Sequence, residues 1–197
     1  MRLCLTLAAA FLALPLLASA ADQASTLLGK DAPMLSGQGT SGRLVNLAQM
    51  RRDVEFLKDD KGQLVKLPDG RYKTQVTDYV IVLNFFATYC VPCVREIPTF
   101  NKIATAYPGQ PVRFVYVNVD NEKSPAEVKD FAATKGIAVE MMFPSISYAV
   151  KTYEVDALPH IVVIDSKGKV STVITGFQDD LAAQLDQIIR PLLPKAG

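Results

Sequence analysis

The chain has 197 residues, three cysteines, one histidine, no tryptophan and a formal net charge of +1. Its 21 basic and 20 acidic side chains leave no global positive field, which argues against a dedicated nucleic-acid-binding protein. A composition that is 49% apolar and 21% charged is typical of a globular chain with a hydrophobic core. Three cysteines are too few for a disulfide-rich scaffold or a Cys4 zinc site.

The first twenty residues have the three regions of a secretory signal peptide. Arg2 supplies the positive charge, Leu3–Leu17 forms the apolar stretch, and Ala18 and Ala20 occupy the −3 and −1 positions of a cleavage site. A membrane anchor is the alternative, but this stretch is shorter than the roughly 20 residues that a spanning helix needs. We therefore expect cleavage after Ala20, export to the periplasm, and no stable membrane insertion of residues 21–197.

Cleavage would remove Cys4 and leave residues 21–197 as one α/β domain with two cysteines. Residues 21–42 are rich in Ser, Gly and Ala, which predicts an exposed lead-in. The further elements predicted in chain order are a strand at 43–47, a turn or short helix at 48–52, a polar insertion at about 53–79 with a hairpin formed by 63–67 and 71–76, a strand at 79–86, a helix at 93–107, a strand at 112–119, helices at 124–135 and 145–153, strands at 160–165 and 169–176, and a helix at 181–193.

The insertion is polar, and its charged side chains between residues 51 and 61 indicate a solvated surface loop. Its alternative role is a binding surface, if the chain were a redox-inert interaction module. The order of the remaining elements predicts a βαβ unit followed by a ββα unit.

Two cysteines, Cys90 and Cys93, lie where a buried strand is followed by a helix. Free N–H groups and the positive end of the helix dipole stabilise a thiolate there, and a Cys-x-x-Cys beside a βαβ unit predicts redox chemistry. We expect Cys90 to be the solvent-facing nucleophile and Cys93 the more buried resolving cysteine. Half a zinc site is one alternative, but only His160 remains to complete it. A structural disulfide is another, although so short a loop removes little unfolded-state entropy.

Residues 84–98 read NFFATYCVPCVREIP, which resembles the active-site stretch of the thioredoxin superfamily, and most of all its periplasmic TlpA/ResA/CcmG-like thiol-disulfide oxidoreductases. The common family form is NFWATWCxPCxxExP, so Phe86 and Tyr89 replace both tryptophans, while Pro98 matches the family's helix-kink proline. The resemblance covers roughly residues 42–193 apart from the insertion. It implies a thioredoxin-like fold, in which helices flank a central mixed β-sheet, here with an N-terminal extension and a hairpin-like insertion.

The resemblance also implies supporting roles for five further residues. Asn84 stands where cytoplasmic thioredoxins carry a buried Asp, and Pro92 matches the motif proline. Leu158 and Pro159 match the cis-proline loop that pairs with substrate, although a Leu-Pro bond judged on its own is usually trans. Glu96 matches a glutamate that influences cysteine protonation, whereas on the residues alone it is an ordinary acidic residue near a helix N-terminus.

The single histidine, His160, allows two further interpretations. Together with Cys90 and Cys93 it could form a copper site, but the copper-assembly proteins of related fold resemble Cys-x-x-x-C, which is one residue longer. Otherwise His160 is a half-exposed loop residue that modulates the thiolate or does nothing. We expect no metal, and no cofactor besides the Cys90–Cys93 disulfide.

The residues between the cysteines bear on the direction of electron flow. Val91 and Pro92 supply neither charge nor a side-chain donor, whereas strongly oxidising relatives place a histidine there. We therefore expect a disulfide reductase, with oxidising or isomerising exchange as the alternative. A thiol peroxidase of the peroxiredoxin type would carry Pro and Thr at the positions of Leu83 and Ala87.

The resemblance implies the partners. They are protein disulfides, among them the haem-binding cysteines of apocytochrome c during cytochrome c maturation, and a membrane electron donor of the DsbD/CcdA kind. No nucleic acid is expected to bind.

Overall fold

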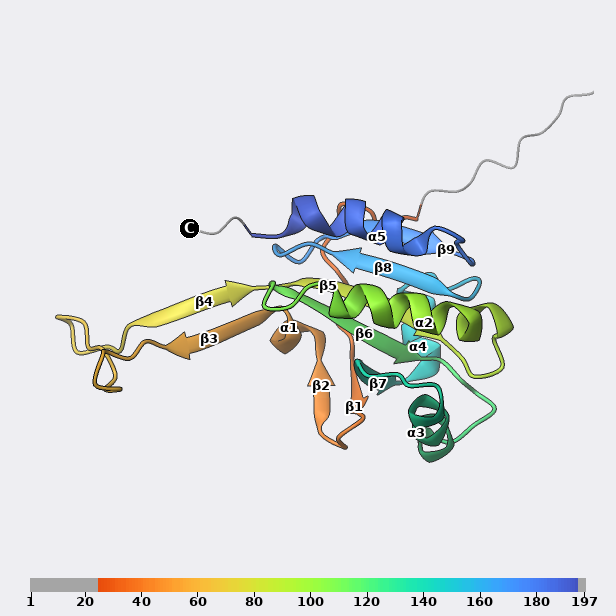
Figure 1. Ribbon diagram of the computed structural model, residues 1–197, viewed down its shortest axis with the longest axis horizontal. Coiled ribbons are helices and arrows are strands. Elements are labelled where there is room, and N and C mark those ends of the chain that lie inside the picture. Colours follow the sequence, from red (N-terminus) through yellow and green to blue (C-terminus); the bar gives the residue numbers. More distant parts are fainter. Residues whose placement is uncertain (1–24, 195–197) are drawn as a thin grey trace, which may run out of the picture.

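The computed structural model describes residues 25–194, and the predicted signal peptide lies outside this range. Seven strands form one mixed sheet in the order β2-β1-β7-β6-β5-β8-β9 (Figure 1). They are β1 (Ser36–Gly39), β2 (Leu44–Asn46), β5 (Val80–Phe86), β6 (Val112–Asn118), β7 (Glu140–Pro144), β8 (His160–Ile164) and β9 (Val170–Thr175). β6 pairs in parallel with both β5 and β7, and the other pairs are antiparallel.

Helices cover both faces of this sheet. They are α1 (Leu47–Met50), α2 (Val91–Thr105), α3 (Pro125–Thr134), α4 (Ile146–Thr152), α5 (Leu181–Ile189) and the short 3-10 helix η1 (Arg190–Leu192). Buried side chains of α2, α3 and α5 share one core, and those of α1 and α4 share the other. None of these helices has the length and hydropathy needed to cross a membrane. The arrangement is the mixed sheet between helices that the sequence predicts.

The central strand β5 is buried over its whole length because helices lie on both sides of it. Successive side chains of a strand point to opposite faces, so Val80, Val82 and Phe86 pack into the α2 core while Leu83 and Phe85 pack into the other. This two-sided burial explains why the sequence of β5 is a nearly continuous apolar run. The same alternation turns Asn84 towards α2.

The prediction of an exposed lead-in at residues 21–42 is wrong for several of the described residues. Residues 36–39 form β1, which lies between β2 and β7 inside the sheet, and Leu27 and Leu35 are buried in the core of α1 and α4. Strand β7 also has no counterpart among the predicted elements. The remaining predicted strands and helices are present within about two residues of their predicted ends, except that the helix predicted at 181–193 ends as α5 at Ile189 and is followed by η1.

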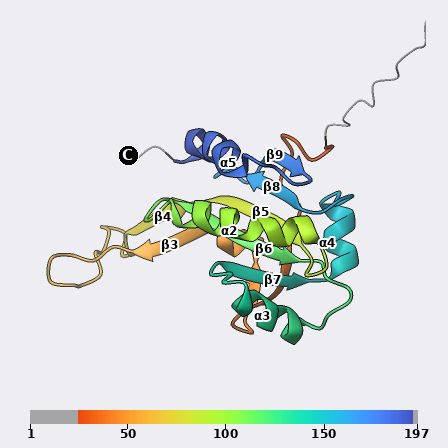
Figure 2. The ribbon, with the colours of Figure 1, turned by 45° about the vertical axis from the view of Figure 1, so that its right-hand side comes forward.

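Residues 52–78 form a separate two-stranded ribbon that we call the arm. It consists of β3 (Arg52–Phe56) and β4 (Thr74–Asp78), paired in antiparallel register. The hairpin predicted at 63–67 and 71–76 is present only in part: Lys66 bridges Tyr72, and the backbone N–H groups of Leu67 and Lys73 donate to the carbonyls of Arg71 and Val65. Residues 74–76, by contrast, pair with 54–56 of β3. The arm projects from the body of the protein in both views (Figures 1 and 2).

Candidate active site

A disulfide between Cys90 and Cys93 closes the first turn of α2, with its sulfur atoms 2.10 Å apart. Cys90 is the N-cap residue, and its Sγ accepts a hydrogen bond from the backbone N–H of Cys93 at 3.2 Å. The exposed fraction is 8% for Cys90 and 3% for Cys93. Cys93 is thus the more buried, as expected, but Cys90 is far less solvent-facing than the sequence suggests.

The turn that leads into the disulfide is fastened by a buried carboxylate, Asp120, which follows β6. Asp120 accepts hydrogen bonds from the hydroxyl and the backbone N–H of Thr88, the latter at 2.7 Å, and from the backbone N–H groups of Glu122 and Lys123 at 2.9 and 3.0 Å. Burial alone would raise the pKa of Asp120, but these hydrogen bonds outweigh it, so the pKa is lowered.

Sequence reasoning missed Asp120. The available signal was its position directly after a buried strand, since parallel strands that end at one edge of a sheet bring their following residues together. β5 and β6 are such a pair. The residues after β5 lead to Cys90, and those after β6 include Asp120.

The bond between Leu158 and Pro159 is cis, as the family resemblance implies. Pro159 is buried, and its carbonyl accepts a hydrogen bond from the backbone N–H of Gly176 at 2.8 Å. Leu158 is half-buried and lines a pocket together with Cys90. The structure thus brings the predicted proline loop and the predicted cysteine pair to the same place.

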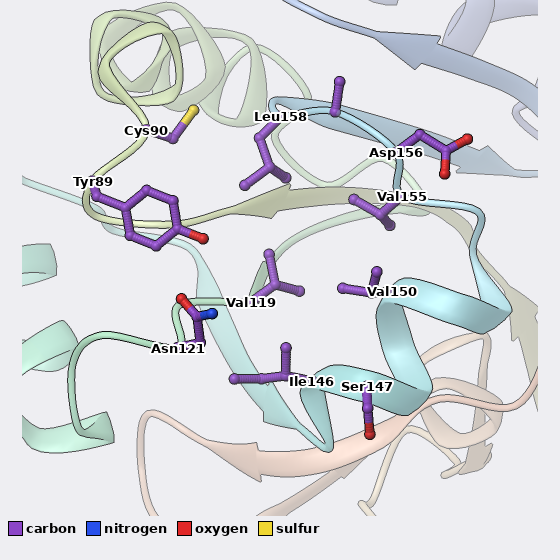
Figure 3. A pocket seen from close by; sticks show the side chains of 11 residues that line it. Tyr89, Cys90, Val119, Asn121, Ile146, Ser147, Val150, Val155, Asp156 and Leu158 are labelled. Carbon is purple, nitrogen blue, oxygen red and sulfur yellow. The ribbon is translucent and has the colours of Figure 1, made fainter.

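This pocket has a volume of about 680 Å³ and lies beside the disulfide (Figure 3). Its apolar lining comes from Tyr89, Val119, Ile146, Val150, Val155 and Leu158, and its polar lining residues are Asn121, Ser147 and Asp156. Figure 3 shows Tyr89 and Leu158 on the side of Cys90, with Ile146 and Val150 of α4 across from them. An apolar recess at a reactive sulfur is suited to hold a side chain of another polypeptide.

The loop before the cis-proline is tied to the first described residues of the chain. The carboxylate of Glu154 accepts hydrogen bonds from the hydroxyl of Ser25 at 2.8 Å, from the backbone N–H of Thr26 at 3.0 Å and from the hydroxyl of Thr26. Glu154 has a φ of 55°, in the left-handed region. It stands next to Val155, so this tie lies at the edge of the pocket.

Glu96 is buried beneath the outer surface of α2, with 2% of its surface exposed. Neither of its carboxylate oxygens has a hydrogen-bond partner among the described residues, and burial raises its pKa to about 7. It lies one helical turn beyond Cys93, on the same side of α2. The reading of Glu96 as an ordinary acidic residue is therefore wrong, because such residues lie in solvent.

Two more buried polar side chains lie beneath α2. Asn84 of β5 and Tyr116 of β6 are direct neighbours across the parallel strand pair. The Oδ1 of Asn84 and the hydroxyl of Tyr116 also lack hydrogen-bond partners among the described residues. Burial, and then the charge of Glu96, raise the pKa of Tyr116. These three side chains form a polar group within an otherwise apolar core.

His160 is not the half-exposed loop residue of the sequence analysis. It begins β8, is 2% exposed, and its Nδ1 lies 3.2 Å from the hydroxyl of Thr175. Its ring packs against Phe85 with centroids 5.7 Å apart, on the face of the sheet opposite to α2. Burial is the main reason that its pKa is lowered. Within residues 25–194, no three His, Cys, Asp or Glu side chains are grouped to hold a metal ion.

The outer rim of the site is apolar. Tyr89 is 46% and Val91 77% exposed, and Pro92 is also exposed. Further along α2, the guanidinium of Arg95 lies 3.7 Å from the ring centre of Phe177, and 65% of the side chain is exposed. Residues 89–92 thus present an uncharged surface around the disulfide.

A comparison with protein-family models matches residues 29–189 to the family described as Redoxin. The chain belongs to the Redoxin family. Among curated proteins, it is 33% identical over 134 residues to the thiol-disulfide oxidoreductase ResA of Geobacillus thermodenitrificans, a match that covers 67% of this chain and 72% of the relative. It is 26% identical over 124 residues to the sporulation thiol-disulfide oxidoreductase A of Bacillus subtilis, covering 62% of this chain and 71% of that protein.

The fold comparison agrees with this Redoxin assignment. The crystal structure of a putative thiol:disulfide interchange protein DsbE from Chlorobium tepidum superposes with a TM-score of 0.64 at 23% identity, covering 84% of this chain and 96% of that one. The fold is therefore thioredoxin-like, as the resemblance implies. This Redoxin member is a thiol-disulfide oxidoreductase of the ResA/DsbE type, with a Cys-x-x-Cys active site at Cys90 and Cys93.

Proposed function

We propose that this chain is a periplasmic disulfide reductase for protein substrates, among which the cysteines of apocytochrome c are the first candidates. The observation that carries this proposal is the position of Cys90. Its sulfur lies at a helix N-terminus and lines the same apolar pocket as Leu158 of the cis-proline loop. A polypeptide bound along this loop would place its disulfide against Cys90 and a neighbouring side chain in the pocket.

In the proposed reaction, the Cys90 thiolate attacks one sulfur of a substrate disulfide and forms a mixed disulfide, while the other substrate sulfur leaves as a thiolate. Cys93 then loses its proton and attacks the Cys90 sulfur. This step forms the Cys90–Cys93 disulfide and releases the second substrate thiol. Two electrons pass from the enzyme to the substrate, and two protons complete the substrate thiols.

Glu96 is suited to take the proton that Cys93 loses. Its carboxyl group has a pKa of about 7, lies on the Cys93 side of α2, and has no hydrogen-bond partner among the described residues to hold it in one ionisation state. A group that titrates near neutral pH can both accept and return a proton under working conditions. Asn84 and Tyr116 would supply the polar surroundings in which the ionised form is tolerated.

The surroundings of the sulfur atoms support the proposed direction of electron flow. Val91 and Pro92 offer no charge to stabilise a thiolate beyond the helix N-terminus itself, which favours a reducing couple. Export by the predicted signal peptide would place this couple in an oxidising compartment. There it needs a supply of electrons, and a membrane donor of the DsbD/CcdA kind is the partner that we propose.

The decisive experiment is a Cys93→Ser trap in the native compartment. Without its resolving thiol, Cys90 should accumulate as mixed disulfides, and mass spectrometry of the linked proteins should identify apocytochrome c or other thiol proteins. The Cys90→Ser, Cys93→Ser double variant is the control. Recovery of no linked protein in the trap beyond this control would reject the proposed substrate class.

The reduction potential tests the direction separately. We expect a value nearer to about −270 mV, as for thioredoxin, than to about −120 mV, as for a strong oxidant. A potential near the second figure would identify an oxidase and overturn the reductase proposal.

A further inference from the structure

Tyr116 is buried in the core beneath α2, and within the described part of the chain its hydroxyl has no hydrogen-bond partner. The two other buried tyrosines have one. Tyr107 donates to the carboxylate of Asp186 at 2.8 Å, and Tyr153 donates to the carbonyl of Pro33 at 2.6 Å. An unpaired buried hydroxyl lowers stability, and phenylalanine would fill the same space without that cost. A tyrosine at this position therefore indicates a use for the hydroxyl beyond packing.

Aromatic neighbours fix the position of the Tyr116 ring. Its centroid lies 5.2 Å from that of Phe86 and 4.8 Å from that of Phe100. Phe100 belongs to α2 and follows Glu96 by four residues, so these two buried side chains lie on the same side of the helix, one turn apart. Tyr116 thus contacts the underside of α2 beside the turn that holds Glu96.

Glu96 also lies within electrostatic range of this hydroxyl. Burial is the main cause that raises the pKa of Tyr116, and the charge of Glu96 is the second. Because its pKa is raised, the hydroxyl keeps its proton near neutral pH and always has a hydrogen to donate. Among the described residues, neither carboxylate oxygen of Glu96 has a partner either. A donor without an acceptor and an acceptor without a donor therefore lie in one small region.

The other elements around this region bring no competing charge. The buried side chains that α3 and α5 direct into this core are apolar, and α2 adds the disulfide. The hydroxyl of Tyr107 is already paired, Asn84 of β5 is uncharged, and His160 of β8 lies on the opposite face of the sheet. Within the described chain, Glu96 is the charged side chain that faces Tyr116.

We propose that Tyr116 is a positioning residue of the exchange reaction: its hydroxyl donates a hydrogen bond to the ionised carboxylate of Glu96 and keeps that carboxylate ready to take the proton of Cys93. This inference rests on the proposed function, in which Glu96 receives that proton. Neither group is held by another hydrogen bond, so rotation of the Glu96 side chain brings the two together. In an apolar core, such a donor offsets part of the cost of the negative charge.

The hydroxyl suits both states of Glu96, because a hydroxyl group can donate one hydrogen bond and accept others. Before the transfer it donates to the carboxylate. As Cys93 attacks the Cys90 sulfur, the S–H bond of Cys93 breaks and an O–H bond forms on Glu96. The hydroxyl of Tyr116 keeps its own proton and turns to accept from the new carboxylic acid. One proton has then moved, from Cys93 to Glu96.

The direct test is the pKa of Glu96 in the oxidised protein, read from the carbon-13 NMR signal of its carboxyl group, which Glu96→Gln identifies. Tyr116→Phe keeps the ring contacts with Phe86 and Phe100 and removes only the donor. We expect this substitution to raise the pKa of Glu96 by about 1, because hydrogen bonds to charged groups are among the stronger ones. The control is Tyr107→Phe in the same core, which should leave the pKa of Glu96 unchanged.

A kinetic measurement tests the part of Tyr116 in the reaction. Reduced protein is mixed with excess oxidised glutathione and quenched with acid, and mass spectrometry follows the loss of the Cys90–glutathione adduct, which reports the attack by Cys93. A rise of about 1 from a pKa of about 7 leaves about one fifth as much Glu96 carboxylate at pH 7. Tyr116→Phe should therefore slow this step about fivefold at pH 7 and change it little at pH 9.

The proposal is overturned if Tyr116→Phe leaves the pKa of Glu96 unchanged or lowers it, or if Tyr107→Phe raises it as much. It is equally overturned if the resolving step keeps its rate, or if it slows by the same factor at pH 7 and pH 9, as a general structural defect would cause. Circular dichroism should show the same fold in both variants. The NMR titration involves no substrate, so its outcome is separate from that of the Cys93→Ser trap, which tests the proposed function.

Discussion

The Sγ of Cys90 accepts a hydrogen bond from the backbone N–H of Cys93, 3.2 Å away. The same N–H would remain available to a Cys90 thiolate after reduction, whereas Cys93 lies inside the helix, where its sulfur has no such position. Charge-assisted hydrogen bonds are stronger than neutral ones, so this geometry favours ionisation of Cys90 over Cys93.

The two thiols should therefore differ in reactivity. In the reduced protein we expect Cys90 to be alkylated by iodoacetamide at a lower pH than Cys93. The measurement is the alkylation rate against pH in the single variants Cys93→Ser and Cys90→Ser, each retaining one thiol. Equal profiles, or a more reactive Cys93, would contradict the assignment of Cys90 as the attacking thiol.

Glu96 should make stability depend on pH in an unusual direction. Burial raises its pKa from 4.5 to about 7, so between these values the folded protein binds more protons than the unfolded chain. The contribution of Glu96 to stability is then present in full below pH 4.5 and is lost as the pH rises through about 7. The shift corresponds to about 3 kcal/mol.

The matching variant is Glu96→Gln, which cannot ionise. In urea unfolding of the oxidised protein, we expect the free energy of unfolding of this variant not to fall between pH 5 and 8, as it does in the unaltered protein. At about pH 8 the variant should therefore be the more stable of the two. In reduced protein, the same variant should alter how the exchange rate depends on pH. A variant that leaves both pH profiles unchanged would remove Glu96 from the proposed proton transfer.

Asp120 should support the active site through the turn at Thr88. Asp120→Ala removes the acceptor of several hydrogen bonds and should cost about 1–3 kcal/mol. Because its pKa is lowered, this contribution is present above the ordinary value of 3.8 and is lost as the pH falls through the folded-state value. We also expect slower disulfide exchange, since Cys90 follows this turn.

A second aspartate offers a matched control. Asp165 accepts hydrogen bonds from the backbone N–H groups of Lys167 and Lys169 in the turn between β8 and β9. Asp165→Ala should also lower stability but should leave the exchange rate of the folded protein unchanged. If both variants slowed exchange equally, Asp120 would have no special part in positioning the disulfide.

The pocket should govern recognition of proteins and not the chemistry of the sulfur atoms. Val150 of α4 lines it opposite Cys90, so Val150→Leu and then Val150→Phe should fill it in steps. We expect KM for a protein disulfide to rise through this series, while the rate with a small disulfide such as oxidised glutathione changes little. A parallel loss with both substrates would assign Val150 to the fold instead.

The cysteine pair and most strands were predictable because each leaves a local mark in the sequence, whereas the cis-proline loop was predictable only through the family resemblance. β5 is a continuous apolar run, and α3 begins with a capping box at Ser124 and Glu127 that the structure contains. β1 left no such mark. Its sequence is Ser-Gly-Gln-Gly, and Gly37 is required because a Cβ there would overlap the backbone of Phe143 on β7.

Other features were not predictable because they depend on contacts between residues that are distant in the sequence. The burial of Glu96 and His160 was not predictable, because each polar residue is covered by elements distant in sequence: the strands beneath α2 in one case, and Phe85 with Thr175 in the other. The pairing of the arm was missed because the turn signals within its tip suggested a shorter hairpin. Its real strands enclose two small turns, closed at Gly62 and Gly70.

The tie between Glu154 and the residues Ser25 and Thr26 determines where attached sequences emerge. Ser25 lies beside the substrate pocket, because it is hydrogen-bonded to Glu154 at the pocket edge. A bulky purification tag fused ahead of Ser25 would therefore hinder access of protein substrates to the pocket and lower the apparent activity. The 3-10 helix η1 lies at the other end, near the base of the arm (Figures 1 and 2). A tag at that end is the better choice for kinetic work.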